Sequence, residues 1–170
     1  MMMQAPVNIS EARAVAFDLS DLPDLSATPC RRIWLSQRQP IWTLVDAVDY
    51  AWLSANVWNV WHAGTGRGDS WMLYAKRNVG PSRSTVRMHR EIMIAADPGR
   101  DEAFLAAHVV DHINGQTLDN RRCNLRWATK RDNAICRRTR GTAPTLDAIV
   151  RQIVADALQG ARQLEDIPFD

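Results

Sequence analysis

The sequence predicts a small mixed α+β domain, and three patterns in its 170 residues support this prediction. Residues 33–80 are rich in tryptophan, valine and tyrosine, with turn residues between short apolar runs, which is typical of β-hairpins. Residues 105–140 have a strand–loop–strand–helix pattern. Residues 145–164 have an amphipathic pattern, in which Ile149 and Ile153 belong to an apolar series at helical spacing.

The elements before residue 105 are predicted from short apolar runs and the turn residues between them. A β-branched and aromatic run at 41–45 indicates a strand, and Asp46 or Asp49 lies near the expected start of a following helix. The tryptophans of this region suit a hydrophobic core, with a nucleic-acid stacking surface as the alternative. The expected elements, in order, are a strand at 41–45, a helix at 46–55, hairpin strands at 57–61 and 71–76 around a loop at 64–69, a strand at 84–88 and a helix at 89–96.

Composition divides the chain into four segments, which we interpret as one domain with extensions. Residues 1–30 are an acidic N-terminal extension, with one short helix expected within 11–25. Residues 31–104 are the Trp-rich α+β module, a candidate support for nucleic-acid binding if its tryptophans form a stacking surface. Residues 105–140 contain the polar side chains that are candidates for catalysis and metal binding. Residues 141–170 hold the amphipathic helix and a tail.

Several classes of protein do not fit the sequence. No run of about 18 apolar residues predicts a membrane span, and residues 1–10 lack the basic-then-apolar pattern of a secretory signal. Cys30, Cys123 and Cys136 are odd in number and form no C-x-x-C pair, which argues against a disulfide framework and against a cysteine zinc site. We therefore expect a protein of the reducing cytoplasm.

The net charge of +2 is unevenly distributed along the chain. Residues 1–30 and 141–170 each have a net charge of −3, whereas residues 31–140 have a net charge of +8. Residues 121–140 alone contain eight basic residues and one acid. This block indicates a polyanionic partner, because each phosphate contact releases condensed counterions, and a solvated basic helix face is the alternative.

The segment 105–140 combines polar side chains with a layout that brings them together. We expect a strand ending near Asp111 and His112, a turn and polar loop, a second strand at 124–128, and a helix that Thr129 caps in a capping-box arrangement with Asp132. A bend after His112 and a helix packed across both strands would let Asp111 and Asn133 converge on one ion. A carboxylate and an amide oxygen, completed by water and phosphate, suit Mg²⁺, which Mn²⁺ can replace.

His112 is the natural general base of such a site. The ordinary pKa of histidine, about 6.5, leaves it neutral at working pH and able to accept a proton from water. The ion would polarise a phosphodiester and stabilise the leaving oxygen. The sequence therefore predicts metal-assisted phosphodiester hydrolysis.

These residues resemble a known motif. The run Asp111-His112-Ile113-Asn114-Gly115, then Leu118 to Arg126, Thr129 and Asn133, is similar to the HNH endonuclease motif (the ββα-metal fold). It is most similar to the bacteriophage and intron-encoded version, in which the last position is Asn. Met88 to Ile92 and parts of 45–58 also resemble segments of those proteins, so the resemblance covers about residues 41–140.

The resemblance implies roles for individual residues. Asp111 and Asn133 would be metal ligands, His112 the general base, and Asn124 a brace of the loop that holds His112 in orientation. Cys136 departs from the family, in which Asn is common at that position. The implied protein is a DNA endonuclease of phage or prophage origin in a bacterial cytoplasm.

We expect double-stranded DNA as the substrate and nicking by a monomer, because one centre makes one cut. His89 is a candidate supporting residue, with packing as the alternative, and a protein partner could use the acidic termini or the C-terminal helix. A DNA-binding accessory protein on a decayed HNH fold, with a structural His112, is the rival hypothesis. The candidate phosphate ligands are Arg121, Arg122, Arg126, Lys130, Arg131, Arg137, Arg138 and Arg140.

Overall fold

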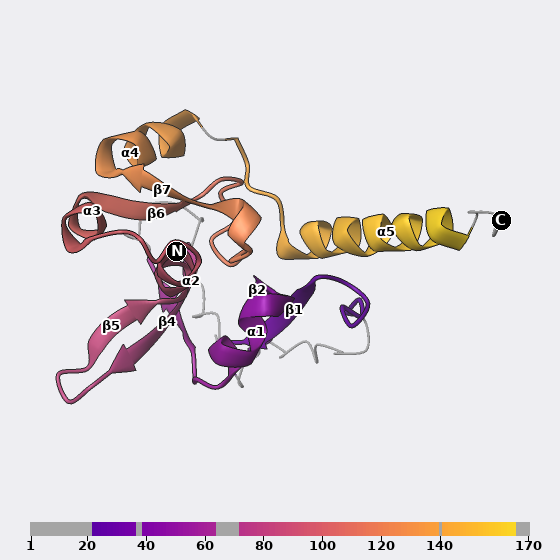
Figure 1. Cartoon of the computed structure of the whole chain (residues 1–170), viewed down its shortest axis with the longest axis horizontal. Coiled ribbons are helices and arrows are strands. Elements are labelled where there is room, and N and C mark those ends of the chain that lie inside the picture. Colours follow the sequence, from indigo (N-terminus) through magenta and orange to yellow (C-terminus); the bar gives the residue numbers. More distant parts are fainter. Residues whose placement is uncertain (1–21, 37–38, 64–71, 140, 166–170) are drawn as a thin grey trace, which may run out of the picture.

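The computed structural model describes residues 22–36, 39–63, 72–139 and 141–165 (Figure 1). The expected loop 64–69 and most of the helix expected within 11–25 lie outside these residues. The elements are β1 (Cys30–Trp34), β2 (Trp42–Asp46), α1 (Ala47–Ser54), β3 (Asn59–His62), β4 (Leu73–Val79), β5 (Ser84–Arg87), α2 (Met88–Ala96), α3 (Glu102–Ala107), β6 (His108–His112), a 3-10 turn η3 (Arg122–Asn124), β7 (Leu125–Thr129), α4 (Lys130–Thr139) and α5 (Leu146–Glu165).

The strands form three small antiparallel sheets, so the protein is a mixed α+β domain as predicted. β1 pairs with β2, β3 to β5 form a meander, and β6 pairs with β7. A parallel bridge joins Leu44 of β2 to Asp119 in the loop between β6 and β7. Through this bridge the first sheet is attached directly to the segment in which chemistry is expected.

One large hydrophobic cluster joins the three sheets. Val45, Leu53, Trp58, Met88 and Ile92 are each at most 2% exposed and belong to one cluster, which also includes residues of β6 and the following loop. This burial favours the core interpretation for Trp58, because its ring is 2% exposed and cannot offer a stacking surface. The core therefore fixes the N-terminal sheet, α2 and the β6–β7 hairpin against one another.

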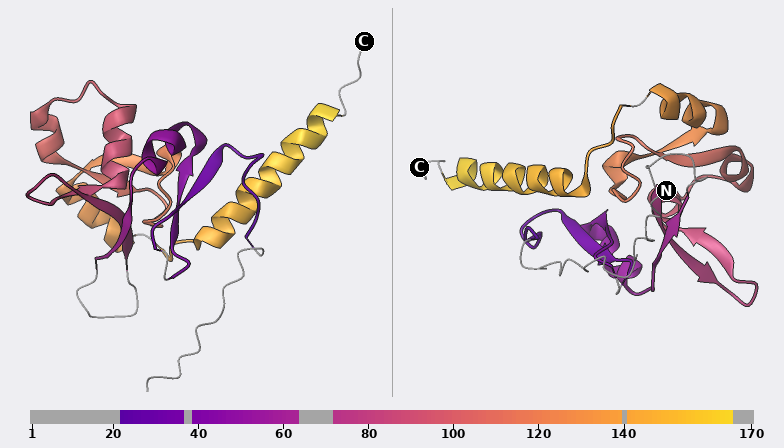
Figure 2. Two further views of the ribbon diagram at one scale, coloured as in Figure 1. Left: turned by 90° about the horizontal axis from the view of Figure 1, so that it is seen from below. Right: turned by 180° about the vertical axis from the view of Figure 1, so that it is seen from behind.

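The C-terminal helix α5 projects from the body, as both views in Figure 2 show. Its first half is anchored by Leu146, Ile149 and Val150, which pack with Trp42 and Leu44 in a second apolar cluster. Farther along, Leu158 is 59% exposed. The predicted amphipathic helix is thus confirmed, and among its described side chains those of the N-terminal half pack on the domain. Among the described residues, no helix is long and apolar enough to cross a membrane.

Two elements differ from the sequence-based expectations. Helix α3 (Glu102–Ala107) overlaps the beginning of the segment 105–140, where a strand was expected. The helix forms because the Asp101 side chain accepts a hydrogen bond from the Phe104 amide at 2.7 Å and so caps a short helix before β6 begins. Strand β1 was not predicted. Its two adjacent arginines hide the apolar alternation, and the Arg32 guanidinium lies 4.6 Å from the Trp42 ring centroid on the paired strand.

Candidate active site

The candidate site lies where β6 ends, between β7 and the start of α4. Asp111 pairs with Arg126 across the hairpin, and His112 pairs with Leu125. The Thr129 hydroxyl accepts the Asp132 amide hydrogen at 3.1 Å and donates to the Asp132 carboxylate at 2.6 Å. This cap begins α4 at Lys130, as predicted, and sets the helix directly after β7.

Asp111, His112 and Asn133 line one small pocket of about 40 Å³, together with Tyr74 and others. Asp111 and His112 are 4% and 3% exposed. The chain turns sharply just beyond His112, because the Gly115 amide donates to the His112 carbonyl oxygen at 3.1 Å and Gly115 has a φ of 82°. The convergence of a carboxylate, an imidazole and an amide agrees with the expected layout.

Asp111 is held by a basic side chain from the neighbouring strand. Its Oδ2 accepts hydrogen bonds from Arg126 Nη2 at 2.9 Å and from Nε at 3.2 Å. The hydrogen bond to Asp111 is the main cause of the raised pKa of Arg126, so the guanidinium stays charged. Arg126 Nη2 also lies 3.0 Å from the sulfur of Cys136, the residue that stands where the resembling family commonly has Asn.

His112 is surrounded by a polar partner and two other rings. Its Nε2 lies 3.0 Å from the Oδ1 of Asn120, a residue that is fully buried. The His89 ring meets it edge-on at 5.1 Å between centroids, and the Tyr74 ring lies at 6.0 Å. Burial, followed by repulsion from His112, lowers the pKa of His89 well below its usual range. His89 is 5% exposed, so its ring is packed beside His112 and is not open to solvent.

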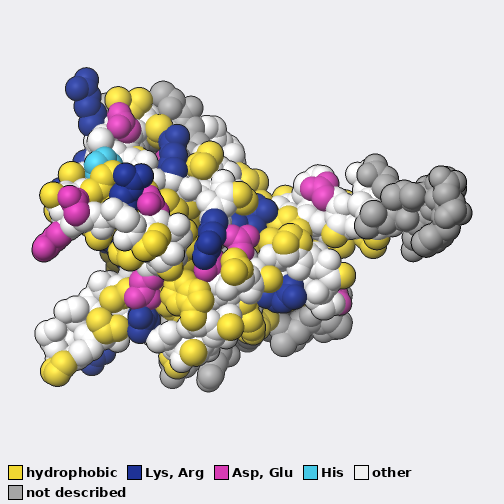
Figure 3. Space-filling view, viewed as in Figure 1, with side chains coloured by type: hydrophobic (Ala, Val, Ile, Leu, Met, Phe, Trp, Pro, Cys, Tyr) yellow, Lys and Arg dark blue, Asp and Glu magenta, His cyan; other side chains and the backbone are white. Residues whose placement is uncertain are grey.

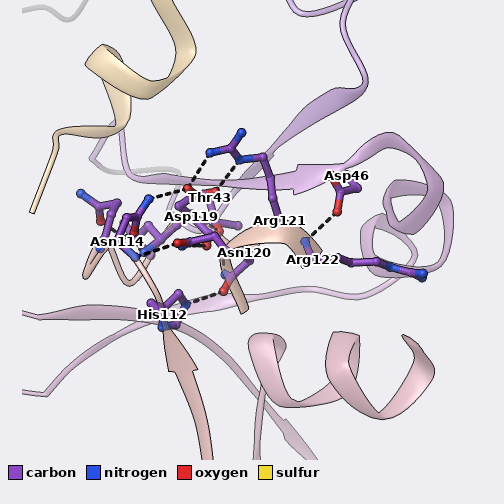
Figure 4. Close-up of polar contacts among 11 residues, drawn as sticks. Thr43, Asp46, His112, Asn114, Asp119, Asn120, Arg121 and Arg122 are labelled. Carbon is purple, nitrogen blue, oxygen red and sulfur yellow. Dashed lines mark hydrogen bonds and ion pairs between the residues drawn. The ribbon is translucent and has the colours of Figure 1, made fainter. Parts of the chain in front are cut away.

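The loop between β6 and β7 is closed by side-chain bonds (Figure 4). The Asn124 Oδ1 accepts from the Asn114 amide at 2.9 Å, and its Nδ2 donates to the Asp119 carbonyl at 2.8 Å. The Asp119 carboxylate in turn accepts from the Asn114 side chain at 2.9 Å. Asn124 therefore joins two parts of the loop, whereas the side chain within hydrogen-bond distance of the His112 Nε2 is that of Asn120.

The five predicted phosphate ligands whose side chains the structure describes fall into two groups. Arg121, Arg122 and Arg126 form ion pairs with Asp119, Asp49 and Asp111, all of which are at most 4% exposed on the carboxylate side. Lys130 and Arg131 are exposed at the start of α4. The side chains of Arg137, Arg138 and Arg140 lie outside the described part of the structure. Figure 3 shows one face of the molecule, on which Lys and Arg side chains are interspersed with Asp and Glu.

The donor atoms of the pocket fit a hard cation. Within the described residues, no group of three or more His, Cys, Asp or Glu side chains suits a metal ion, so a zinc site of that kind is not found there. Asp111 and Asn133 offer carboxylate and amide oxygens, and Mg²⁺ is commonly held by few protein oxygens and several waters.

Two residues at this site were not predicted from the sequence. Asn120 lies in the motif run from Leu118 to Arg126 without an expected role of its own, and Tyr74 falls within the expected hairpin strand 71–76. The alternation along β4 could have indicated that Tyr74 faces the same side as Met72, which also lines the pocket. Nothing in the local sequence indicates that Asn120 contacts Thr43 of β2, since 77 residues separate them.

Comparison with known proteins gives one match. A family model described as HNH endonuclease matches residues 106–135, which include Asp111, His112, Asn124 and Asn133. The match confirms the resemblance for this segment of 30 residues and indicates nuclease activity. Neither the search of curated proteins nor the search of solved structures gave a match.

Proposed function

We propose, on the premise that residues 106–135 are an HNH endonuclease segment, that this protein is a metal-dependent endonuclease that nicks duplex DNA. The observation that carries the proposal is the pocket lined by Asp111, His112 and Asn133 within that segment. A carboxylate and an amide oxygen beside a buried imidazole are the groups that phosphodiester hydrolysis requires.

His112 would act as the general base. Its neutral imidazole accepts a proton from the water that attacks phosphorus, and the partner of its Nε2 keeps the ring from rotating. Asn124 keeps the loop beyond His112 closed through its two backbone contacts. Water attack and proton removal can then occur without rearrangement of the loop.

Asp111 and Asn133 would hold the metal ion. Bound there, Mg²⁺ or Mn²⁺ would supply the positive charge that polarises the scissile phosphate and stabilises the leaving oxygen. The Asp111 carboxylate lies against Arg126, whose side chain is 43% exposed. Arg126 can therefore turn outward to a DNA phosphate when its carboxylate partner takes the ion.

Lys130 and Arg131 are the side chains that we propose for phosphate contacts next to this centre, since both are exposed at the start of α4. Arg121 and Arg122 would instead hold the loop through their carboxylate partners. The Trp-rich module 31–104 would support the nuclease segment. One centre cuts one strand, so a monomer would produce nicks.

The proposal is tested with supercoiled plasmid, with and without Mg²⁺. The wild-type protein should convert the plasmid to the nicked form only with the ion, and EDTA should stop the reaction. The variant His112→Ala should cleave about 10²- to 10⁴-fold more slowly with unchanged DNA affinity. His108→Ala, which removes another imidazole of the same strand, is the matched control and should cleave normally. DNA binding without cleavage under any divalent ion would establish the accessory DNA-binding protein instead.

A further inference from the structure

A continuous chain of hydrogen bonds connects β2 to His112 (Figure 4). The Thr43 hydroxyl lies 2.7 Å from the Leu118 carbonyl oxygen, the Asn120 Nδ2 lies 2.8 Å from the Thr43 hydroxyl, and the Asn120 Oδ1 lies 3.0 Å from the His112 Nε2. Thr43 and Asn120 are both 0% exposed. Water therefore cannot replace either partner without a change in the core.

The direction of each hydrogen bond in this series follows from the bond between Thr43 and Leu118. A carbonyl oxygen only accepts, so the Thr43 hydroxyl must donate its hydrogen to Leu118. The hydroxyl oxygen then accepts from Asn120, which identifies the facing atom as the amide nitrogen. The Asn120 carbonyl oxygen consequently faces His112, and the imidazole must donate from Nε2. In the neutral ring the lone pair is then on Nδ1.

Backbone hydrogen bonds to strand β2 hold Asn120 in place. The Leu44 amide donates to the Leu118 carbonyl at 2.9 Å, and the Asn120 amide donates to the Leu44 carbonyl at 2.8 Å. Leu44 and Asn120 are fully buried. The side chain that contacts His112 is thus fixed by strand β2, which lies outside the matched segment 106–135.

We infer that Asn120, oriented by Thr43, is a positioning residue that keeps the proton of His112 on Nε2 and its lone pair on Nδ1. The inference rests on the proposed function only for its catalytic consequence. The same hydrogen bonds give the Trp-rich module a part in the chemistry, because the residue that orients Asn120 comes from β2.

The first test reads the tautomer directly in the metal-free protein. Side-chain ¹⁵N NMR of the histidines, with the His112 signals assigned from His112→Gln, should show Nε2 protonated and Nδ1 bearing the lone pair at neutral pH. In Asn120→Ala the two tautomers should mix, and in Asn120→Asp, whose carboxylate accepts the same hydrogen, the Nε2–H form should return. A wild-type protein with the proton on Nδ1, or an Asn120→Ala variant with an unchanged tautomer, would overturn the inference.

Two threonine variants separate positioning from a general loss of packing. Thr43→Val and Thr28→Val each remove one buried hydroxyl that donates to a backbone carbonyl, but only Thr43 contacts Asn120. Thr43→Val should change the His112 tautomer ratio, and Thr28→Val should leave it at the wild-type value. Equal tautomer changes in both variants would mean that His112 responds to destabilisation alone, which contradicts the inference.

Kinetics give the catalytic consequence. Asn120→Ala should lower kcat for plasmid nicking by about 10- to 100-fold, as for other outer hydrogen-bond partners of functional histidines, with KM for DNA unchanged and kcat partly restored in Asn120→Asp. An unchanged kcat in Asn120→Ala would overturn the positioning role. If no variant or wild-type protein nicks DNA but the tautomer responds as described, the proposed function fails while the assignment of the hydrogen-bond chain remains correct.

Discussion

The ion pair between Arg122 and Asp49 makes a stability prediction that separates structural arginines from DNA-binding ones. The Asp49 carboxylate is fully buried and accepts two bonds from Arg122, both of 2.7 Å, and a third from the Trp52 indole at 3.1 Å. The Arg122 backbone amide also donates to Asp46 at 2.7 Å. These contacts join α1 to the turn before β7.

Arg122→Ala should lower the free energy of unfolding by about 2 to 3 kcal/mol. Breaking a fully buried pair costs about 3–5 kcal/mol, because one charge is left without its partner. The Arg122 side chain is 39% exposed, so water can reach the carboxylate after truncation, and the expected loss lies at or below the lower end of that range. For a chain of this size the loss corresponds to a fall in Tm of roughly 4–12 °C.

Urea unfolding at pH 7 measures this free energy, and a salt series of DNA affinities measures the phosphate contacts. Arg122→Ala should leave the salt dependence of DNA binding unchanged, whereas Arg131→Ala should reduce its slope by about 1 with wild-type stability. Adding Asp49→Asn to Arg122→Ala should recover about 1 kcal/mol, because the buried charge is then gone. A stable Arg122→Ala protein with a reduced salt slope would refute the reasoning and return Arg122 to the DNA-binding set.

Two further predictions concern the surroundings of the pocket. The pKa of His89 is held well below 6.5 by burial, so the unfolded chain takes up a proton below about pH 6.5 that the folded chain does not. The free energy of unfolding should therefore fall as the pH drops from 6.5, and His89→Gln should remove this slope in urea unfolding between about pH 5 and 7.5. Arg126→Ala should tighten Mn²⁺ binding to the DNA-free protein by up to about fivefold in calorimetry, since the competing pair is partly exposed and contributes at most about 1 kcal/mol. Weaker Mn²⁺ binding in that variant would contradict the placement of the ion at Asp111.

The sequence predicted the local parts of the fold because local signals determine them. A few neighbouring residues determine the Thr129–Asp132 cap, the Asn114-Gly115 turn and the apolar period of α5. Strand β1 was not predicted because Arg31 and Arg32 occupy its centre. Their guanidinium groups bond to backbone carbonyls, and that of Arg32 also covers the Trp42 ring, which no pattern of apolar residues can indicate.

In the candidate site, too, the sequence indicates the local arrangement and misses the long-range contacts. The convergence of Asp111, His112 and Asn133 follows from the order of two strands and a helix, which their spacing in the sequence indicates. The partner of His112 could not be predicted, because Asn120 is set by a strand far back in the chain. The number of basic residues also overestimated the free positive charge, since buried carboxylates from α1 and the loop neutralise several of them.

The attachment of β2 to the loop at 118–120 has a consequence for how the protein folds. Thr43 and Asn120 lie 77 residues apart, so bringing them together closes a long loop, at an entropic cost on the order of 4 kcal/mol. Contacts of this range form late, after the local hairpins and helices. Asn120 lies only eight residues from His112, but its side chain is oriented by Thr43 only once β2 has docked on the loop. Acquisition of activity by a refolding chain should accordingly follow long-range docking rather than hairpin formation.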